Sequence, residues 1–186
     1  MARVKKQPVS RRTASRSRRR AGRYVDLVGI RGFMRVQLTD ARNGEILGDS
    51  GYRKNQVTNH GKDVYIVRSI GGIAANKTVS HLAIATQTTA PAAADTSVQG
   101  EFGGRKLLND TTDTGSNRKL LASVGTLQMI ASWAGADLGT DSPKTIGAIA
   151  AFNTSSGGSM LCAATYPTSQ WTSDQNVNAT YELRVS

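Results

Sequence analysis

The first 23 residues of this chain carry ten basic side chains and no acidic one. The ten are Arg3, Lys5, Lys6, Arg11, Arg12, Arg16, Arg18, Arg19, Arg20 and Arg23. The other fourteen Lys and Arg lie beyond residue 23 together with all 13 Asp and Glu, so residues 24–186 are close to neutral. A segment so charged and so poor in large apolar side chains gains too little from burial to offset its ordering entropy. We therefore expect residues 1–23, the arm, to be disordered in isolation, and residues 24–186, the body, to fold.

Eight of the ten arm cations are arginines, and two kinds of partner suit them. The phosphates of a nucleic acid attract such a segment by counterion release, without any reading of base sequence. The carboxylates of an acidic protein surface accept paired hydrogen bonds from the planar guanidinium group. The residue types alone leave both open. A targeting role is disfavoured, because no apolar core follows the charges as in a secretory signal and no continuous apolar face marks a mitochondrial presequence.

The start of the body predicts a β-hairpin and then a short helix. Residues 33–39 alternate in part between apolar and polar side chains, and residues 45–50 return as a second strand after the turn at Asn43-Gly44. Thr58 or Asn59 is suited to cap a helix over residues 61–70, which Gly71-Gly72 would end. Val64, Val67 and Ile70 are spaced to form the apolar face of this helix.

The rest of the body is a succession of short strand-like segments separated by turn residues. The strands expected here span residues 79–86, 106–109, 118–124, 126–133, 146–152, 160–166 and 177–185. Residues 88–97 and 153–159, rich in small side chains, read as loops. The pattern predicts a mainly β fold, an antiparallel sandwich or jelly roll with one short helix, in which residues 24–56 form a leading hairpin and residues 57–186 the core. No apolar run approaches the roughly 20 residues that a membrane-spanning helix needs.

Side chains that carry catalysis or bind metals are few and scattered. His60 and His81 have no histidine or cysteine partner at ligand spacing, and the single Cys162 fits a small buried residue of a protein assembled in a reducing cytoplasm. The 103–106 stretch (GGRK) lacks the spacing and the Ser or Thr of a phosphate-binding loop. Acids in turn-like stretches are expected to cap turns; they are Asp95, Glu101, Asp110, Asp113, Asp137 and Asp141. We therefore expect no catalytic residues, no metal, no cofactor and no enzymatic activity.

The aromatic side chains are sparse and do not alternate with basic ones, as they would in a platform that stacks single-stranded bases. Trp133 and Phe152 lie on expected strands and are predicted to be core residues. Trp171 precedes the last strand in a Ser- and Thr-rich stretch. It is predicted to pack in the body, with an anchor at an interface as the alternative.

Three stretches of the body form a recognisable pattern: residues 57–61 (VTNHG), 81–97 (HLAIATQTTAPAAADTS) and 149–167 (IAAFNTSSGGSMLCAATYP), followed by the alternating strand 177–185. In this pattern residues 57–186 resemble a type of tailed-phage virion structural protein. This chain departs from the pattern at Ala85 and Gln87, which replace glycines, and at Cys162-Ala163, which replace Ala-Arg. Members of the type are head-decoration or tail-associated components, so the resemblance implies a subunit of a virus particle.

These observations together favour a non-enzymatic virion subunit, assembled in the host cytoplasm, that decorates a capsid. Its expected partners are other virion proteins, reached through the ten arm cations, and further copies of itself in a trimer or other small ring. No membrane partner is expected. One alternative is a shell-forming coat protein whose arm binds the packaged genome, and another is a tail or adaptor component. From a different class, a nucleic-acid-binding regulator would need base-reading side chains on an ordered element, which the body does not supply.

Overall fold

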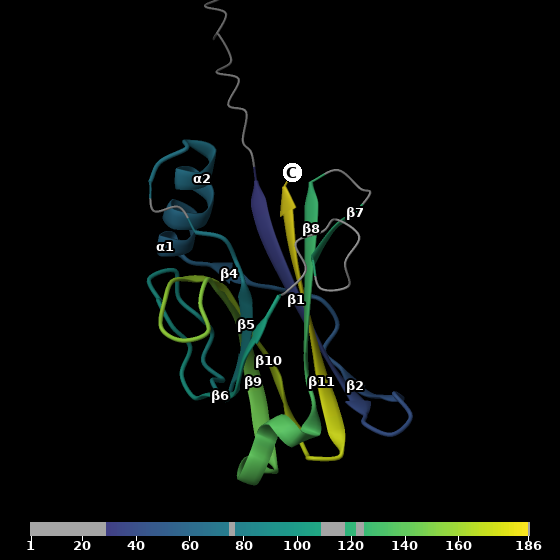
Figure 1. Cartoon of the computed structure of the whole chain (residues 1–186). Helices are drawn as coiled ribbons and strands as arrows, with labels where there is room; N and C mark the ends of the chain where they lie inside the picture. Colours follow the sequence, from purple (N-terminus) through teal and green to yellow (C-terminus); the bar gives the residue numbers. More distant parts are fainter. Residues whose placement is uncertain (1–28, 75–76, 109–117, 122–124, 186) are drawn as a thin grey trace, which may run out of the picture.

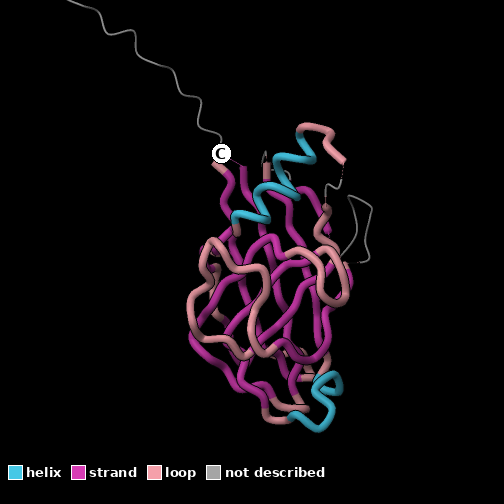
Figure 2. Tube along the Cα trace, turned by 90° about the vertical axis from the view of Figure 1, so that its left-hand side faces the viewer, coloured by secondary structure: helices cyan, strands magenta, loops and turns pink. Residues whose placement is uncertain are grey.

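The computed structural model describes residues 29–74, 77–108, 118–121 and 125–185, and shows two antiparallel β-sheets packed face to face (Figure 1). Figure 2 shows a helical segment at one end of this sandwich and a short helical turn at the other. The mainly β, two-sheet architecture with one short helix is the fold that the sequence predicted. The arm lies outside the described residues.

The first sheet, sheet I, joins strands from both ends of the described chain. Its strands are β1 (Ile30–Asp40), β2 (Ile46–Asp49), β3 (Arg53–Lys54), β7 (Arg118–Leu121), β8 (Thr126–Trp133) and β11 (Gln175–Val185). They lie in the order β2-β1-β11-β8-β7, and β3 also pairs with β1. The predicted leading hairpin is therefore present as β1 and β2, and β1 pairs along its whole length with β11.

The second sheet, sheet II, is built from the middle of the chain. Its strands are β4 (Gln56–Val57), β5 (His81–Ala85), β6 (Glu101–Leu107), β9 (Lys144–Phe152) and β10 (Met160–Trp171). They lie in the order β4-β10-β9-β5-β6. The chain crosses from sheet I to sheet II at Asn55, between β3 and β4.

Alternation along the strands divides the core into two clusters. In β5, Leu82 and Ile84 point between the two sheets, while Ala83 and Ala85 face the other side of sheet II, as alternation along a strand requires. The inner cluster contains both tryptophans, each fully buried, so Trp171 is a core residue and not an interface anchor. The outer cluster is made mainly of alanines and is completed by Val98 from the connection between β5 and β6.

The helical segment comprises α1 (Asn59–Gly61), the π-helical η1 (Lys62–Val67) and α2 (Arg68–Ile70). Thr58 caps it, as predicted: its Oγ1 accepts a hydrogen bond from the Gly61 amide at 2.8 Å. Thr58 Oγ1 also donates to the Met160 carbonyl at 2.9 Å, which ties the cap to β10.

The predicted apolar face of this helix is only partly correct. Val64 is buried, but Val67 and Ile70 are 57% and 82% exposed. The cause is the π-helical turn, in which the Arg68 amide bonds the Asp63 carbonyl five residues back. The wider turn brings Val64 and Tyr65 against the core and rotates the residues that follow towards solvent.

Several strand bounds differ from the prediction, for local reasons. Strand β6 spans Glu101–Leu107 and not 106–109, because Gly103 and Gly104 adopt positive φ within it and concealed its start. Strand β10 runs on to Trp171 instead of ending at residue 166, and a register shift accommodates Pro167. The turn η2 (Gly135–Asp141) was not predicted. The expected strand residues 122–124 and residue 109 lie outside the described residues.

Candidate contact surface

The chain enters and leaves the sandwich at one end, which we call the arm-side end. The first residue of β1, Ile30, pairs with the last residue of β11, Val185. The helical segment lies at this same end, beside the start of β1 (Figure 1). The ten predicted arm cations all lie outside the described residues. The structure does define the end of the body at which β1, the first described strand, begins.

Apolar side chains project from the helical segment and from the turn that follows it, at the arm-side end. Val67, Ile70 and Ile73 are 57%, 82% and 51% exposed. Val185, at the end of β11, is also largely exposed. A single exposed apolar residue is ordinary, whereas several at one end of a domain are typical of a contact surface. We refer to Val67, Ile70 and Ile73 as the helix patch.

The helix patch is held on a rigid base. A β-carbon at Gly61 would stand 2.2 Å from the Leu161 carbonyl oxygen, so only glycine allows this close approach of helix and β10. The Tyr65 hydroxyl donates to the Ser159 carbonyl. His60 Nε2 lies 3.0 Å from the Ser159 hydroxyl. The helix is thereby fixed to the beginning of β10 at several points, which gives the exposed side chains a defined position.

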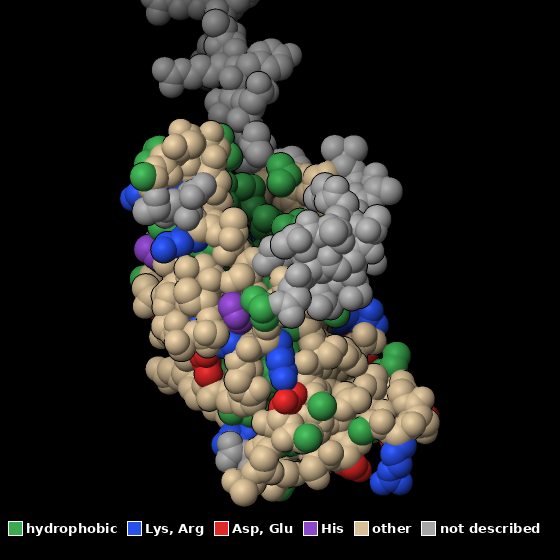
Figure 3. All heavy atoms as spheres, in the orientation of Figure 1, with side chains coloured by type: hydrophobic (Ala, Val, Ile, Leu, Met, Phe, Trp, Pro, Cys, Tyr) green, Lys and Arg blue, Asp and Glu red, His purple; other side chains and the backbone are tan. Residues whose placement is uncertain are grey.

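Next to the helix patch, the arm-side end is hollowed between the helix and the ends of both sheets. The hollow has a volume of about 310 Å³. It is lined by Tyr65, Ile66, Ser69, Lys77, Thr78, Val79, Leu127, Met129, Leu161 and Leu183. Figure 3 shows apolar side chains gathered in this hollow at the upper end of the molecule. A concave, mainly apolar site of this kind suits aliphatic side chains of a polypeptide.

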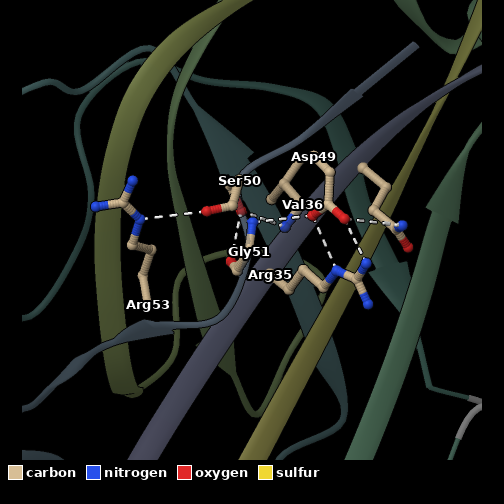
Figure 4. A network of polar contacts seen from close by, with 7 residues as sticks. Arg35, Val36, Asp49, Ser50, Gly51 and Arg53 are labelled. Atoms are coloured by element: carbon tan, nitrogen blue, oxygen red, sulfur yellow. Dashed lines mark hydrogen bonds and ion pairs between the residues drawn. The ribbon is translucent and has the colours of Figure 1, made fainter. Parts of the chain in front are cut away.

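The outer face of sheet I, in contrast, carries an ion pair between Arg35 and Asp49 (Figure 4). Arg35 Nε donates to Asp49 Oδ1 at 2.9 Å, and a second nitrogen of the same guanidinium contacts Oδ2. This hydrogen bonding with Arg35 lowers the pKa of Asp49 to about 2. The Ser50 hydroxyl accepts from the Val36 amide at 2.9 Å. These contacts hold the turn after β2 on β1.

A buried carboxylate lies in the same face. Burial opposes the charge of Glu182, but hydrogen bonds from Arg184, Gln128 and Tyr52 outweigh it and lower the pKa of Glu182. The guanidinium of Arg184 lies 4.4 Å from the centre of the Phe33 ring. Each of these polar groups therefore contacts another member of the cluster, as in a hydrogen-bond network that stabilises the fold.

The GGRK stretch also has a structural role. Arg105 forms an ion pair with Glu101 at 2.8 Å and stacks 3.4 Å from the centre of the Phe152 ring. Its Nη1 donates to the carbonyls of Thr154 and Gly157, at 3.1 and 2.7 Å. Arg105 thus fixes the loop between β9 and β10 against sheet II.

The other residues that the sequence analysis considered for catalysis or metal binding make contacts within the body. Burial raises the pKa of the Cys162 thiol to about 12. His81 Nδ1 lies 2.7 Å from the Ser80 hydroxyl. The carboxylates of Asp95 and Asp137 accept from the backbone amides of Ala92 and Ala134, as turn caps do. Glu101 does not cap a turn, since it pairs with Arg105.

Two findings concern the described residues as a whole. No group of three or more His, Cys, Asp or Glu side chains among them is placed to hold a metal ion. No helix within the described ranges is long and apolar enough to cross a membrane. The predicted acids Asp110 and Asp113 lie outside the described residues, and the side chain of Asp141 is not described.

Comparison with models of known protein families found no match, and a search of curated proteins found no similar chain. The helix patch and the hollow were missed by sequence reasoning. A signal for the patch was present in Ile70 and Ile73, the two apolar residues on either side of Gly71-Gly72. An apolar residue at the end of a short helix is often only partly covered by the rest of the protein. Nothing local indicates the hollow, because its walls come from five separate segments of the chain.

Proposed function

We propose that this protein is a non-enzymatic structural subunit of a virus particle, a capsid-associated decoration or cement protein. In this proposal the body sits on the particle and the arm docks on neighbouring shell proteins. The observation that carries it is the division of the chain: ten cations precede residue 24, and the body beyond is nearly neutral. The resemblance of residues 57–186 to tailed-phage structural proteins supports the same assignment.

The geometry of the body favours attachment at the arm-side end. The chain enters β1 beside the helix patch, so an arm that binds a neighbouring subunit brings Val67, Ile70 and Ile73 towards it. Apolar contacts of the patch would add to the ionic contacts of the arm. The Arg35–Asp49 and Arg184–Glu182 pairs on the outer face of sheet I, in contrast, are already satisfied within the body.

Weak contacts of each arm would suffice for attachment to the particle if several copies of the subunit act together. Linked binding events raise the effective concentration of each later one, so a trimer or other small ring of subunits could hold the particle through many modest arm contacts. We expect such a closed ring because identical subunits assemble most often with closed symmetry.

Two measurements on native particles test the proposal. Mass spectrometry of purified particles should detect this chain among the shell components. Trypsin should cleave the arm of the free subunit, which has ten Lys and Arg before residue 24, and should spare it in the assembled particle. Absence of the chain from the particle, or equal cleavage in both states, would refute the assignment.

A shell-forming coat protein with a genome-binding arm is the second candidate. It is favoured by the same cations, because phosphates attract them without any sequence requirement. An electron-microscopy map of the whole particle separates the two, since the arm points into the interior of the shell in the coat protein and along the outer surface in the decoration protein.

A further inference from the structure

The hollow at the arm-side end combines apolar walls with one cation. Its lining includes the aliphatic side chains of Ile66, Leu127 and Leu183, together with Lys77. Within the described ranges, the ammonium of Lys77 forms no ion pair with a carboxylate. An occupant that suits the hollow therefore presents aliphatic side chains and one negative charge.

The chain enters the described body beside this hollow. Leu183, in the wall, is the β11 partner of Gly32 in β1, and Leu127 in β8 is the partner of Leu183 on its other side. Gly32 lies two residues beyond the start of β1 at Ile30. Strand β1 thus begins next to the mouth of the hollow.

The sequence of those residues has the required chemistry. Residues 24–28 read Tyr-Val-Asp-Leu-Val, four apolar side chains around the first acid of the chain, Asp26. They differ sharply from the arm, which has ten cations and no acid. Five residues span at most about 16 Å. Gly29 joins them to β1, and a glycine can adopt the backbone conformations that a reversal of chain direction needs.

We propose that residues 24–28 of the same chain fill this hollow, with Val25, Leu27 or Val28 against its apolar wall and Asp26 paired with Lys77. In this arrangement the apolar side chains of residues 24–28 cover the apolar wall of the hollow. This inference concerns the free subunit and does not depend on the proposed virion role.

The first test measures the stability of the full chain. A variant with Val25→Ser, Leu27→Ser and Val28→Ser should lower Tm by about 4 °C or more, the shift expected when a domain of this size loses one buried aliphatic contact. The matched control carries Val4→Ser and Val9→Ser in the arm and should melt like the parent chain. Equal Tm values for the triple variant and the control would overturn the proposal.

The second test locates the segment by disulfide formation. Val25→Cys, Leu27→Cys or Val28→Cys is combined with Ser69→Cys, in the lining, or with Ser132→Cys, near the opposite end of β8. The buried Cys162 is retained throughout. At least one pair with position 69 should form a disulfide within one chain, and pairs with position 132 should not. Disulfides that join two chains only, or none with position 69, would overturn the proposal.

The third test concerns the ion pair. In a pair that cross-links to position 69, Asp26→Lys should slow disulfide formation about two- to fivefold, the range for one partly exposed ion pair. Adding Lys77→Asp should restore the rate, because the charges are then exchanged. If the double exchange does not restore the rate of disulfide formation, Asp26 does not pair with Lys77 and that part of the proposal is overturned. A lost virion assignment would leave all three results unchanged, so the two proposals fail separately.

Discussion

Gly61 lies against the main chain of Leu161, so closely that a β-carbon at position 61 would meet the Leu161 carbonyl oxygen at 2.2 Å. This contact joins the helical segment to the first residues of β10. Because the obstacle is backbone and not a flexible side chain, it cannot move aside without disturbing sheet II. The position of the whole helix patch therefore depends on the absence of a side chain at residue 61.

Gly61→Ala should destabilise the protein by about 1–3 kcal/mol through overpacking, although alanine is by itself the better helix former by about 1 kcal/mol. Urea unfolding of the full chain measures the change. Gly48→Ala is the matched control, because its nearest neighbour is the Leu38 side chain at 3.8 Å, an ordinary contact. A control as unstable as the Gly61 variant would contradict the explanation.

The Arg35–Asp49 pair should make a pH-dependent contribution to stability. The pKa of Asp49 falls from 3.8 to about 2 in the folded state. The stabilisation is therefore fully present above pH 3.8 and is lost as the pH falls through the folded-state pKa. A double-mutant cycle with Arg35→Gln and Asp49→Asn should give a coupling of about 0.5–1 kcal/mol near neutral pH. This coupling should decline between about pH 4 and about pH 2; a coupling unchanged over that window would rule out the ion pair as its source.

Ile70 should matter for association and not for folding. Ile70→Asp is expected to change the free energy of unfolding by less than about 0.5 kcal/mol, because the side chain is 82% exposed. It should weaken attachment to the particle, measured by co-sedimentation, on the order of tenfold if the side chain anchors the contact. Val64→Asp, on the buried side of the same segment, should instead cost several kcal/mol of stability. Attachment unaffected by Ile70→Asp would exclude the helix patch as a contact.

Whether the arm binds carboxylates or phosphates can be tested without changing the charge of the arm. Replacing the eight arm arginines by lysine keeps ten cations but removes the planar fork that pairs with carboxylates. Docking on acidic shell proteins should then weaken on the order of tenfold or more, while non-specific nucleic-acid binding by counterion release should persist. Attachment that is equally strong with lysines would favour phosphate as the partner.

If the arm does bind nucleic acid through roughly 6–10 phosphate contacts, its affinity should fall about 10³–10⁵-fold between 50 and 200 mM salt. Fluorescence anisotropy with a duplex of arbitrary sequence measures this dependence. The salt series therefore serves as the control for the lysine variant, because the eight replaced arginines are among the ten cations that the salt series probes.

Much of the fold could be predicted because its signals are local. The alternation of residues 81–85 and 177–185 identifies strands and their faces, and the hydroxyl of Thr58 followed by a helical stretch identifies the cap. Asn43-Gly44 indicates the hairpin turn, where Gly44 has a φ of 73°. Each of these features depends on a few consecutive residues.

The rest depends on partners far away in the chain. Strands β3 and β4 have two residues each, too few for any period, and are strands only because β1 and β10 accept them. The exposed Ile70 follows from a π-helical turn that side-chain spacing at 3.6 residues does not reveal. The candidate surface could not be predicted as a surface, since the helix, the 77–79 segment, β8, β10 and β11 meet only in the folded molecule.

The pairing of β1 with β11 also bears on how the protein is made. Strand β11 is the middle strand of sheet I, and it alone joins the β1–β2 side to the β8–β7 side. Sheet I therefore cannot be completed before residues 175–185 are available to pair, and contacts between such distant segments form slowly. Until then β1 and β8 each expose an unpaired strand edge, so we expect the yield of folded protein to respond to chaperones.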